Sequence, residues 1–368
     1  MPHFAPVRVL VLSNHCHDTD RRDVLRAAAG LGVEIIVGTA GGAATEDGAL
    51  RLVPIKTRGD AAQPGELRWD GRAIRRALTE LRPELVHVEA EPESPLAVTL
   101  ADGASRLGVP FVLHSSRSLP AALGFIARRR ARKVLESAVG VIGANRRAMD
   151  LLHEQAPAGI AASIPATGVA LPPLRTPGAG PLVAGFAGRL VPERGADLFF
   201  SALSQTYGKW DAVVAGTGPE QERLEAQVQQ LGLAARIRWL GGIRQETLEA
   251  FWPAIDCLVV PSRDTPGWID QSPPFLIEAM GRGIVPIVTK AGALPEIVGP
   301  AGIVAADAAG LTEALQPFAA DPASCRARSS ATRQWVLDRY VTSVVAARTV
   351  EFWQAAREHA APALAHTH

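Results

Sequence analysis

Short apolar runs alternate with longer amphipathic stretches along most of the 368 residues. The apolar runs of the first half predict strands at residues 8–12, 34–37, 85–88, 111–113 and 139–142. Those of the second half predict strands at residues 183–187, 212–215, 237–240, 258–260, 285–288 and 303–305. The amphipathic stretches between them predict helices, for example at residues 21–31, 71–81, 94–107, 221–231 and 245–251. Strands that alternate with helices are typical of βαβ units, so the pattern predicts an α/β protein with parallel sheets.

A segment rich in proline and glycine, residues 165–181, separates the two sets of strands. Such a composition disfavours helix and stiffens the chain. We therefore predict an N-terminal domain at residues 1–170 and a C-terminal domain at residues 181–332. Apolar positions between 333 and 358 predict one more helix, and we expect the tail at 333–368 to pack back on the first domain.

The composition is that of an ordinary globular protein, with 47% hydrophobic and 20% charged residues. The net charge of +1 favours neither nucleic acid nor a membrane surface as a partner. Cys16, Cys257 and Cys325 are far apart and odd in number, which indicates a reducing compartment rather than a disulfide framework. The chain starts without a signal-peptide pattern, and no run approaches the ~18 apolar residues of a membrane span. We therefore expect a cytoplasmic protein.

Two arginines follow the first strand of the second half. Gly188 and Arg189 come directly after it, and Arg194 precedes a glycine and the next helix. Two guanidinium groups at the carboxyl end of a strand can hold a diphosphate through bidentate hydrogen bonds. The alternative interpretation is a glycine turn with surface arginines, and these residues alone favour that alternative.

A second glycine turn, residues 216–220, also follows a strand. Gly218 precedes a proline, which suits the first position of a helix. The turn lacks the third glycine of a dinucleotide fingerprint, so it predicts no nicotinamide site.

Two carboxylates, Asp270 and Glu278, stand eight positions apart after the strand at 258–260. A strand that ends in a loop and then begins a helix is where open α/β sheets bind ligands. A helix N-terminus favours phosphate, and neighbouring acids can bind hydroxyl groups, a combination that suits a sugar nucleotide. Glu278 taken alone is also explained as an acid of a first helical turn.

The order of these elements resembles the retaining glycosyltransferases of family 4, which have the GT-B fold and include sucrose and trehalose synthases. The resemblance covers residues 181–310 and rests on six segments, at 188–195, 216–220, 240–241, 261–262, 270–280 and 292–296. It implies two Rossmann-like α/β domains whose parallel sheets face a central cleft. It also implies a UDP- or GDP-sugar donor, an acceptor hydroxyl group, and no requirement for a cofactor or metal ion.

The resemblance implies roles for single residues. Arg189 and Arg194 would bind the donor diphosphate, although the family usually has lysine at the second position. Glu278 would accept hydrogen bonds from the ribose. Asp270 stands where the family has a glutamate that contacts the transferred sugar, and aspartate is one methylene shorter. His114 ends a strand near the expected donor sugar, and it is equally well explained as a polar residue at a strand end.

The remaining donor contacts are also implied by the resemblance. Gly188 and Gly218 would border the nucleotide. The backbone around Phe275 and Leu276 would face the diphosphate, and backbone atoms near Ile243 would recognise the base. Together with Glu278 these are the predicted substrate-binding residues, whereas Arg189, Arg194, Asp270 and His114 are the predicted catalytic ones.

Three polar segments of the first half carry open alternatives. His15, Cys16 and His17 are adjacent, and neighbours rarely converge on one metal ion, so we predict no metal site. The acidic residues at 89, 91 and 93 line the acceptor side or form a solvated loop, which is the favoured interpretation. The basic segment 124–133 can lie on an anionic membrane surface, but a solvated helix is favoured.

We therefore expect a retaining glycosyltransferase that acts on a small-molecule, glycan or lipid-linked acceptor. A sugar-nucleotide epimerase of the same fold and a non-catalytic sugar-nucleotide-binding module remain as alternatives. Nucleic acid is not an expected partner, and peripheral membrane contact is the less favoured possibility.

Overall fold

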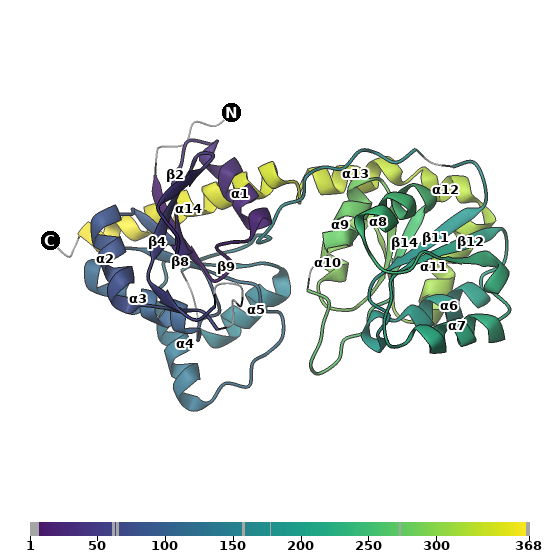
Figure 1. Cartoon of the computed structure of the whole chain (residues 1–368), viewed down its shortest axis with the longest axis horizontal. Helices are drawn as coiled ribbons and strands as arrows, with labels where there is room; N and C mark the ends of the chain where they lie inside the picture. Colours follow the sequence, from purple (N-terminus) through teal and green to yellow (C-terminus); the bar gives the residue numbers. More distant parts are fainter. Residues whose placement is uncertain are drawn as a thin grey trace. The chain divides into compact units, whose positions relative to one another are not determined.

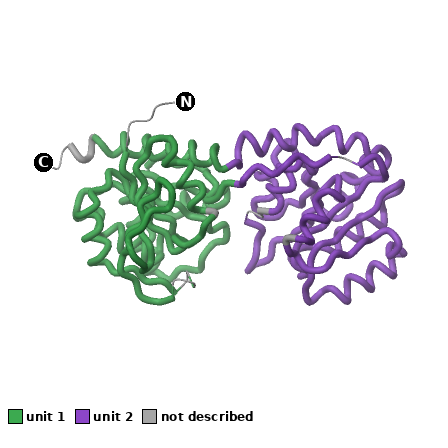
Figure 2. Tube along the Cα trace, turned by 45° about the horizontal axis from the view of Figure 1, so that its top comes forward, with its two compact units in different colours: residues 1–168, 342–368 green, residues 169–341 purple. Residues whose placement is uncertain are grey.

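The computed structural model describes residues 7–60, 63, 66–156, 159–176, 178–271 and 274–365. The chain divides into two compact units, one of residues 1–168 and 342–368 and the other of residues 169–341 (Figures 1 and 2). Each unit is built on a largely parallel sheet with helices on its faces. The predicted α/β class with parallel sheets is therefore confirmed.

The first unit contains an eight-stranded sheet in the order β10-β9-β8-β7-β1-β2-β4-β3. Its strands are β1 Arg8–Ser13, β2 Glu34–Ala40, β3 Thr45–Asp47, β4 Leu50–Ile55, β7 Leu85–Glu89, β8 Phe111–Ser115, β9 Gly140–Gly143 and β10 Ile160–Ser163. Only the edge pair of β3 and β4 is antiparallel among these strands, and β5 Thr57–Arg58 with β6 Arg68–Trp69 forms a separate antiparallel pair. Its helices are α1 Thr19–Ala29, α2 Gly71–Leu81, α3 Pro95–Leu107, α4 Phe125–Ser137, α5 Arg146–Gln155 and α14 Thr342–Ala365.

The second unit contains a six-stranded parallel sheet in the order β13-β12-β11-β14-β15-β16. Its strands are β11 Leu182–Ala187, β12 Trp210–Ala215, β13 Ile237–Trp239, β14 Cys257–Val260, β15 Val285–Thr289 and β16 Ile303–Ala305. Its α-helices are α6 Ala196–Ser204, α7 Gln221–Gln230, α8 Gln245–Phe251, α9 Pro274–Gly281, α10 Leu294–Val298, α11 Ala308–Ala320, α12 Pro322–Arg326 and α13 Ser329–Leu337. All eleven strands expected from the apolar runs are present, whereas β3 to β6 and β10 were not predicted.

The strands of the second unit contribute side chains to two hydrophobic cores, one on each face of the sheet. Along β12, Ala212 and Val214 belong to one apolar cluster, and Val213 and Ala215 belong to the other. This alternation follows from the two-residue repeat of a strand, which directs neighbouring side chains to opposite faces. Helices cover both faces, so β14 and β15 are buried along their whole length. Burial on both faces explains why the sequence shows continuous apolar runs rather than alternating ones.

The proline-rich segment between the two sets of strands is anchored rather than free. Arg175 is buried within it, and its Nη2 donates to Asp256 Oδ1 at 3.0 Å. Arg326 of α12 donates to the same carboxylate from Nε, also at 3.0 Å. The segment from residue 169 onwards therefore belongs to the second unit, because a buried carboxylate and two arginines hold it there.

The single tail helix expected near residues 333–358 is two helices with different partners. The helix α13 belongs to the second unit. Residues 338–341 are not helical and separate it from α14, and Val341 forms a parallel bridge with Val169. The helix α14 belongs to the first unit, where Val345, Val350 and Trp353 are fully buried in its core. Figure 2 shows this helix in the colour of the N-terminal residues.

A membrane-spanning segment needs both length and apolar composition, and none of the helices in the described residues combines the two.

Candidate functional site

The strand order of the second unit reverses between β11 and β14. From β11 the chain proceeds to β12 and β13 on one side, and it then returns to β14 beside β11. Ligands of open α/β sheets bind at such a switch point, outside the carboxyl ends of the strands. The loop after β11 carries Arg189 and Arg194, and the loop after β14 carries Asp270. The fold therefore brings three of the predicted site residues to one edge of the sheet.

Backbone contacts tie these loops to their neighbours. The amide of Gly188 donates to the carbonyl of Ala215 at 3.0 Å, and Gly216 donates to Gly241 at 2.7 Å. Gly216 has a φ of +150°, and a Cβ there would collide with the carbonyl oxygen of Gly188. The glycine is therefore required for the close approach of two loop backbones, which a plain strand-to-helix turn would not demand.

Asp270 is buried and bound to its surroundings. Its Oδ2 accepts hydrogen bonds from Arg194 Nη1 at 2.8 Å and from Ser262 Oγ at 2.6 Å. The backbone carbonyl of Asp270 accepts from the amide of Ala293 at 2.8 Å. The loops after β11, β14 and β15 thus meet at this residue. One carboxylate oxygen is shared by two donors, so the aspartate fixes the position of Arg194.

Arg194 lies between this carboxylate and two aromatic rings. It ends the short 3₁₀ helix η1, Pro192–Arg194, and Gly195 follows it with a φ of +68°. Its guanidinium carbon is 5.0 Å from the ring centroid of Trp268 and 6.0 Å from that of Phe275. A guanidinium group held by a carboxylate and aromatic faces has few conformations to lose when it binds an anion.

Two other predicted donor residues differ in whether their side chains already have a partner within the protein. The side chain of Arg189 is exposed, and it forms neither a hydrogen bond nor an ion pair with another described residue. Glu278 is half-buried on α9 and accepts a hydrogen bond from Arg282 Nη2 at 2.8 Å. The position of Arg189 suits an anionic ligand, whereas Glu278 already has one partner in Arg282, which directly follows its helix.

The remaining predicted substrate contacts lie at the same strand ends. Gly188 and Leu276 are buried, whereas Phe275 and Gly218 are half-buried. Ile243 follows β13, with 45% of its surface exposed. Residues 272 and 273, which precede α9, lie outside the described residues. The structure thus gives positions for these five residues but tests none of their predicted roles.

The sheet of the first unit has its own switch point, between β1 and β7. Arg21 of α1 donates from Nη1 to Glu89 Oε2 at 2.7 Å across it. Arg117 donates to both oxygens of Glu93, at 2.5 and 2.8 Å, and Ser115 donates to Glu91 at 2.5 Å. The solvated loop favoured from the sequence is therefore wrong, because each of the three acids is bound by a neighbouring side chain.

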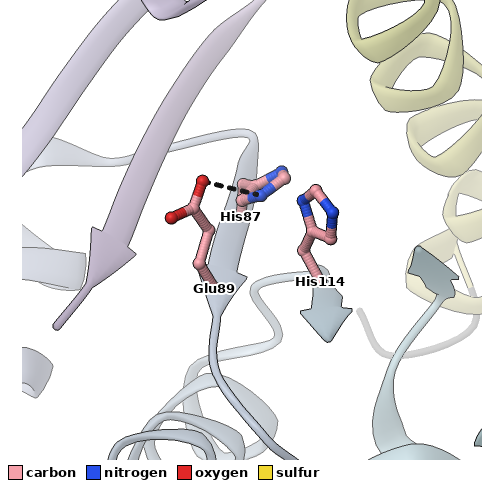
Figure 3. A group of neighbouring side chains, drawn as sticks. All are labelled: His87, Glu89 and His114. Atoms are coloured by element: carbon pink, nitrogen blue, oxygen red, sulfur yellow. Dashed lines mark ion pairs between the residues drawn. The ribbon is translucent and has the colours of Figure 1, made fainter. Parts of the chain in front are cut away.

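His114 belongs to a buried group with His87 and Glu89 (Figure 3). Its Nε2 is 3.1 Å from the carbonyl oxygen of Ile164. Trp353 Nε1 on α14 donates to His87 Nδ1 at 2.8 Å, and His87 Nε2 lies 4.0 Å from Glu89 Oε1. Two histidines on adjacent strands and an indole of the C-terminal helix thus form one polar cluster within the core.

Burial sets the charge of this cluster. It lowers the pKa of His87 to about 4 and that of His114 to about 3, so both rings are neutral near pH 7. Burial alone would raise the pKa of Glu89, but the charge and hydrogen bond of Arg21, together with the two neighbouring histidines, outweigh it and lower the pKa to about 2. The cluster therefore contains two neutral imidazoles beside one ion pair.

The same hydrogen bonds argue against a metal ion here, although the three side chains place one ligand atom each within 4.8 Å of one another. An indole N–H can only donate, so His87 Nδ1 accepts and the neutral ring carries its proton on Nε2. A metal-bound histidine has the opposite polarity, because it donates its other ring N–H. His15, Cys16 and His17 form no comparable group within the described part of the chain.

Several residues of these sites were not anticipated. Trp268 and Arg117 act through contacts with other loops, and nothing in their local sequence indicates this. Ser262 lies in a segment that the resemblance includes, but its hydrogen bond to Asp270 was not predicted. His87 had a signal, because it lies inside the apolar run that predicts β7. A polar residue in a fully buried strand is informative, since it needs a specific partner.

Comparison with known families gives two matches. The family described as glycosyl transferase 4-like domain matches residues 19–165, and glycosyl transferases group 1 matches residues 176–335. The second range contains all the predicted donor-site residues of the second unit.

Curated relatives match parts of the chain. A GDP-mannose-dependent alpha-(1-6)-phosphatidylinositol monomannoside mannosyltransferase of Mycolicibacterium smegmatis is 29% identical over 179 residues, 46% of this chain and 47% of that protein. Glycogen synthase of Mycobacterium tuberculosis is 28% identical over 50% of this chain and 45% of that protein. A 2-deoxystreptamine N-acetyl-D-glucosaminyltransferase of Streptomyces fradiae is 28% identical over 72% of this chain and 69% of that protein. The chain thus spans less than half the length of the first two relatives.

Solved structures are similar over nearly the whole chain. Sucrose-phosphate synthase from Thermosynechococcus elongatus has a TM-score of 0.66 at 18% identity, covering 96% of this chain and 99% of that one. Anabaena HepE in complex with UDP has a TM-score of 0.69 at 16% identity, covering 95% and 100%. At such identities, the likeness shows a shared fold.

Proposed function

Because this chain belongs to the group 1 glycosyltransferases of GT-B fold, we propose that it transfers a sugar from a nucleoside-diphosphate sugar to an acceptor hydroxyl group. The observation that carries the proposal is the arginine of the second unit's switch point, Arg194, fixed by Asp270 beside the exposed Arg189. Relatives described as using GDP-mannose, and a similar fold solved with UDP and glucose, support a nucleotide-sugar donor. The comparisons give no support to the epimerase alternative.

In the proposed donor site, residues at different strand ends bind different parts of the nucleotide sugar. Arg189 and Arg194 bind the diphosphate and stabilise the negative charge that grows on it as the glycosidic bond breaks. Glu278 accepts hydrogen bonds from the ribose hydroxyls with the carboxylate positions that Arg282 leaves free. The backbone near Ile243 contacts the base. This arrangement accounts for the cations and acid that the sequence places at successive strand ends.

Asp270 has a different role in this proposal from that of the family glutamate. Its shorter side chain is bound by Arg194 and Ser262, so it acts as a positioning residue for the arginine. We propose that the sugar is transferred with retention at the anomeric carbon. In this mechanism the oxygen of the leaving phosphate takes the proton of the acceptor hydroxyl, because Asp270 and Glu278 among the described residues each already bind an arginine.

A panel of UDP-, GDP- and ADP-sugars in thermal-shift assays tests the donor site. At 100 times its dissociation constant, the correct donor adds about 2.7 kcal/mol of stability, roughly 5–10 °C for a domain of this size. Glu278→Ala should lose the shift, whereas Glu313→Ala, an exposed acid on α11, should keep it. If no nucleotide sugar stabilises the protein, or Glu278→Ala responds like the control, the proposed site is wrong.

Two further assays test the reaction. Release of nucleoside diphosphate should require both the donor and an acceptor, since turnover of the donor alone would indicate rearrangement or hydrolysis. NMR of the product then gives the anomeric configuration. An inverted centre would refute retention and leave the donor site standing.

A further inference from the structure

The first turn of α4 exposes two large apolar side chains. Phe125 is 79% exposed and Ile126 is 66% exposed. The residues before them, Pro120, Ala121 and Ala122, are also exposed and uncharged. The helix is anchored on its other face through buried Ala131, Val134 and Leu135, so its outward apolar side chains contribute nothing to that core. Exposed apolar side chains gathered at one place indicate a surface that another apolar phase covers.

Cations follow the apolar turn on the same helix. Arg128, Arg129, Arg130, Arg132 and Lys133 are all exposed. The helix contains one acidic residue besides these five basic ones, a net charge of +4 on a chain whose total is +1.

Most of this positive charge is not neutralised by the protein. Arg132 pairs with Glu136 at 2.7 Å and Lys133 with Asp102 at 3.1 Å. The three consecutive arginines 128–130 form no ion pair or hydrogen bond through their side chains with any described residue. The positive charge of this helix therefore remains available to an external anion.

The apolar and cationic side chains share one face of the helix. Phe125, Ile126, Arg129 and Arg130 border the same hollow of the surface, together with Arg132, Lys133 and one acid, Glu136, which pairs with Arg132. Cations beside inserted apolar side chains match the interface of a bilayer, where phosphate groups lie directly above the acyl chains. Nucleic acid offers phosphates but no apolar phase that would cover an exposed isoleucine. The chemistry of this face therefore fits an anionic lipid surface better than a polynucleotide.

We infer that residues 120–133 dock on an anionic membrane surface, with Phe125 and Ile126 inserted below the lipid phosphates and the arginines of α4 among them. The attachment is peripheral and reversible, because only two large side chains enter the bilayer. The sequence alone favoured a solvated helix here. The structure changes that interpretation, since the two large apolar side chains before the arginines point outward instead of into the core. The inference goes beyond the proposed function, since docking requires no donor.

Vesicle flotation tests the inference on the full chain. The protein should float with vesicles of phosphatidylcholine containing about 30% phosphatidylglycerol, and it should not float with phosphatidylcholine alone. Raising the salt to about 0.5 M should release most of it. Phe125→Ser with Ile126→Ser should lower the partition coefficient roughly 100-fold, and Arg129→Glu with Arg130→Glu should abolish flotation.

The matched control variants replace the same kinds of exposed side chain at positions outside α4. Tyr207→Ser removes an aromatic side chain that is 78% exposed in the second unit. Arg72→Glu with Arg238→Glu makes the same change in net charge at two other exposed positions. Both controls should float like the unchanged protein, and circular dichroism should be the same for every variant because all the altered side chains are exposed.

Three outcomes would overturn the inference: equal flotation with neutral vesicles, equal loss in the controls, or binding to RNA without binding to vesicles. Failure here is distinguishable from failure of the proposed function. If the protein binds anionic vesicles but no nucleotide sugar, the membrane inference stands and the proposed function fails. If it binds a nucleotide sugar but no anionic vesicles, only the membrane inference fails.

Discussion

The buried histidine pair predicts that acid destabilises the first unit selectively. His87 and His114 have pKa values lowered from 6.5 to about 4 and about 3 in the folded chain. Between pH 6.5 and those values, the unfolded chain binds more protons than the folded one. The stability that the neutral rings contribute is therefore complete above pH 6.5 and is lost as the pH falls toward 4.

The magnitude follows from the size of the two shifts. At pH 5 an unfolded histidine is almost fully protonated, while both buried rings are still largely neutral. The difference amounts to about 1.5 pH units for each ring, or about 2 kcal/mol each at 1.36 kcal/mol per unit. We therefore expect the free energy of unfolding of the first unit to fall by about 4 kcal/mol between pH 8 and pH 5. Glu89 adds nothing in this range, because its lowered pKa acts only below its ordinary value of 4.5.

The assay must separate the two units. Urea unfolding followed by brief proteolysis and mass spectrometry distinguishes fragments of residues 1–168 from those of residues 169–341. His87→Asn keeps an acceptor for Trp353, and His114→Gln keeps a donor for Ile164, so each removes a titration while preserving a hydrogen bond. Each variant should lose about half of the pH dependence.

His153→Gln is the matched control, since it removes an exposed histidine from α5 of the same unit. Equal stability of the first unit at pH 5 and pH 8 would refute the reasoning. So would a full pH dependence in the variant that lacks both buried histidines.

Three substitutions test other contacts. Asp270→Asn removes the charge that fixes Arg194, so transferase turnover should fall about 100-fold while the thermal midpoint without donor changes by less than a few degrees. Gly216→Ala should destabilise the second unit by about 1–3 kcal/mol through its collision with a loop backbone, whereas Gly178→Ala, with open space around it, should leave the melting temperature unchanged. Asp256→Ala should cost about 3–5 kcal/mol in urea unfolding, because it leaves a buried arginine without its counter-charge.

Sequence patterns predicted most of the fold because the parallel strands are buried on both faces. Runs such as β14 and the first four residues of β15 are apolar throughout, so they predict strands without any knowledge of their neighbours. The missed strands lack this signal, since β3 is mostly exposed and β5 and β6 have two residues each. The break between α13 and α14 was missed for another reason, because both helices bury apolar residues but against different units.

The sequence predicted which loops carry the site residues, but it did not predict the contacts between their side chains. The positions of Arg194 and Asp270 after their strands follow from the motif order. Their ion pair does not, because 76 residues separate them and only the adjacency of β11 and β14 joins their loops. The same holds for Trp353 and His87, which are 266 residues apart. Local sequence cannot specify pairings that the topology creates.

The first unit is formed by two separate parts of the chain, and this has a consequence for its folding during synthesis on the ribosome. Residues 169–341 are contiguous, so the second unit can fold as soon as it has emerged. The first unit, although its sheet is synthesised earlier, must wait for α14, which supplies Val345, Val350 and Trp353 to its core. Until then, the apolar surface that α14 covers and the acceptor nitrogen of His87 stay open. The half of the protein that is made first is therefore the half that is completed last, and a chain truncated before residue 342 would present that surface to chaperones and proteases.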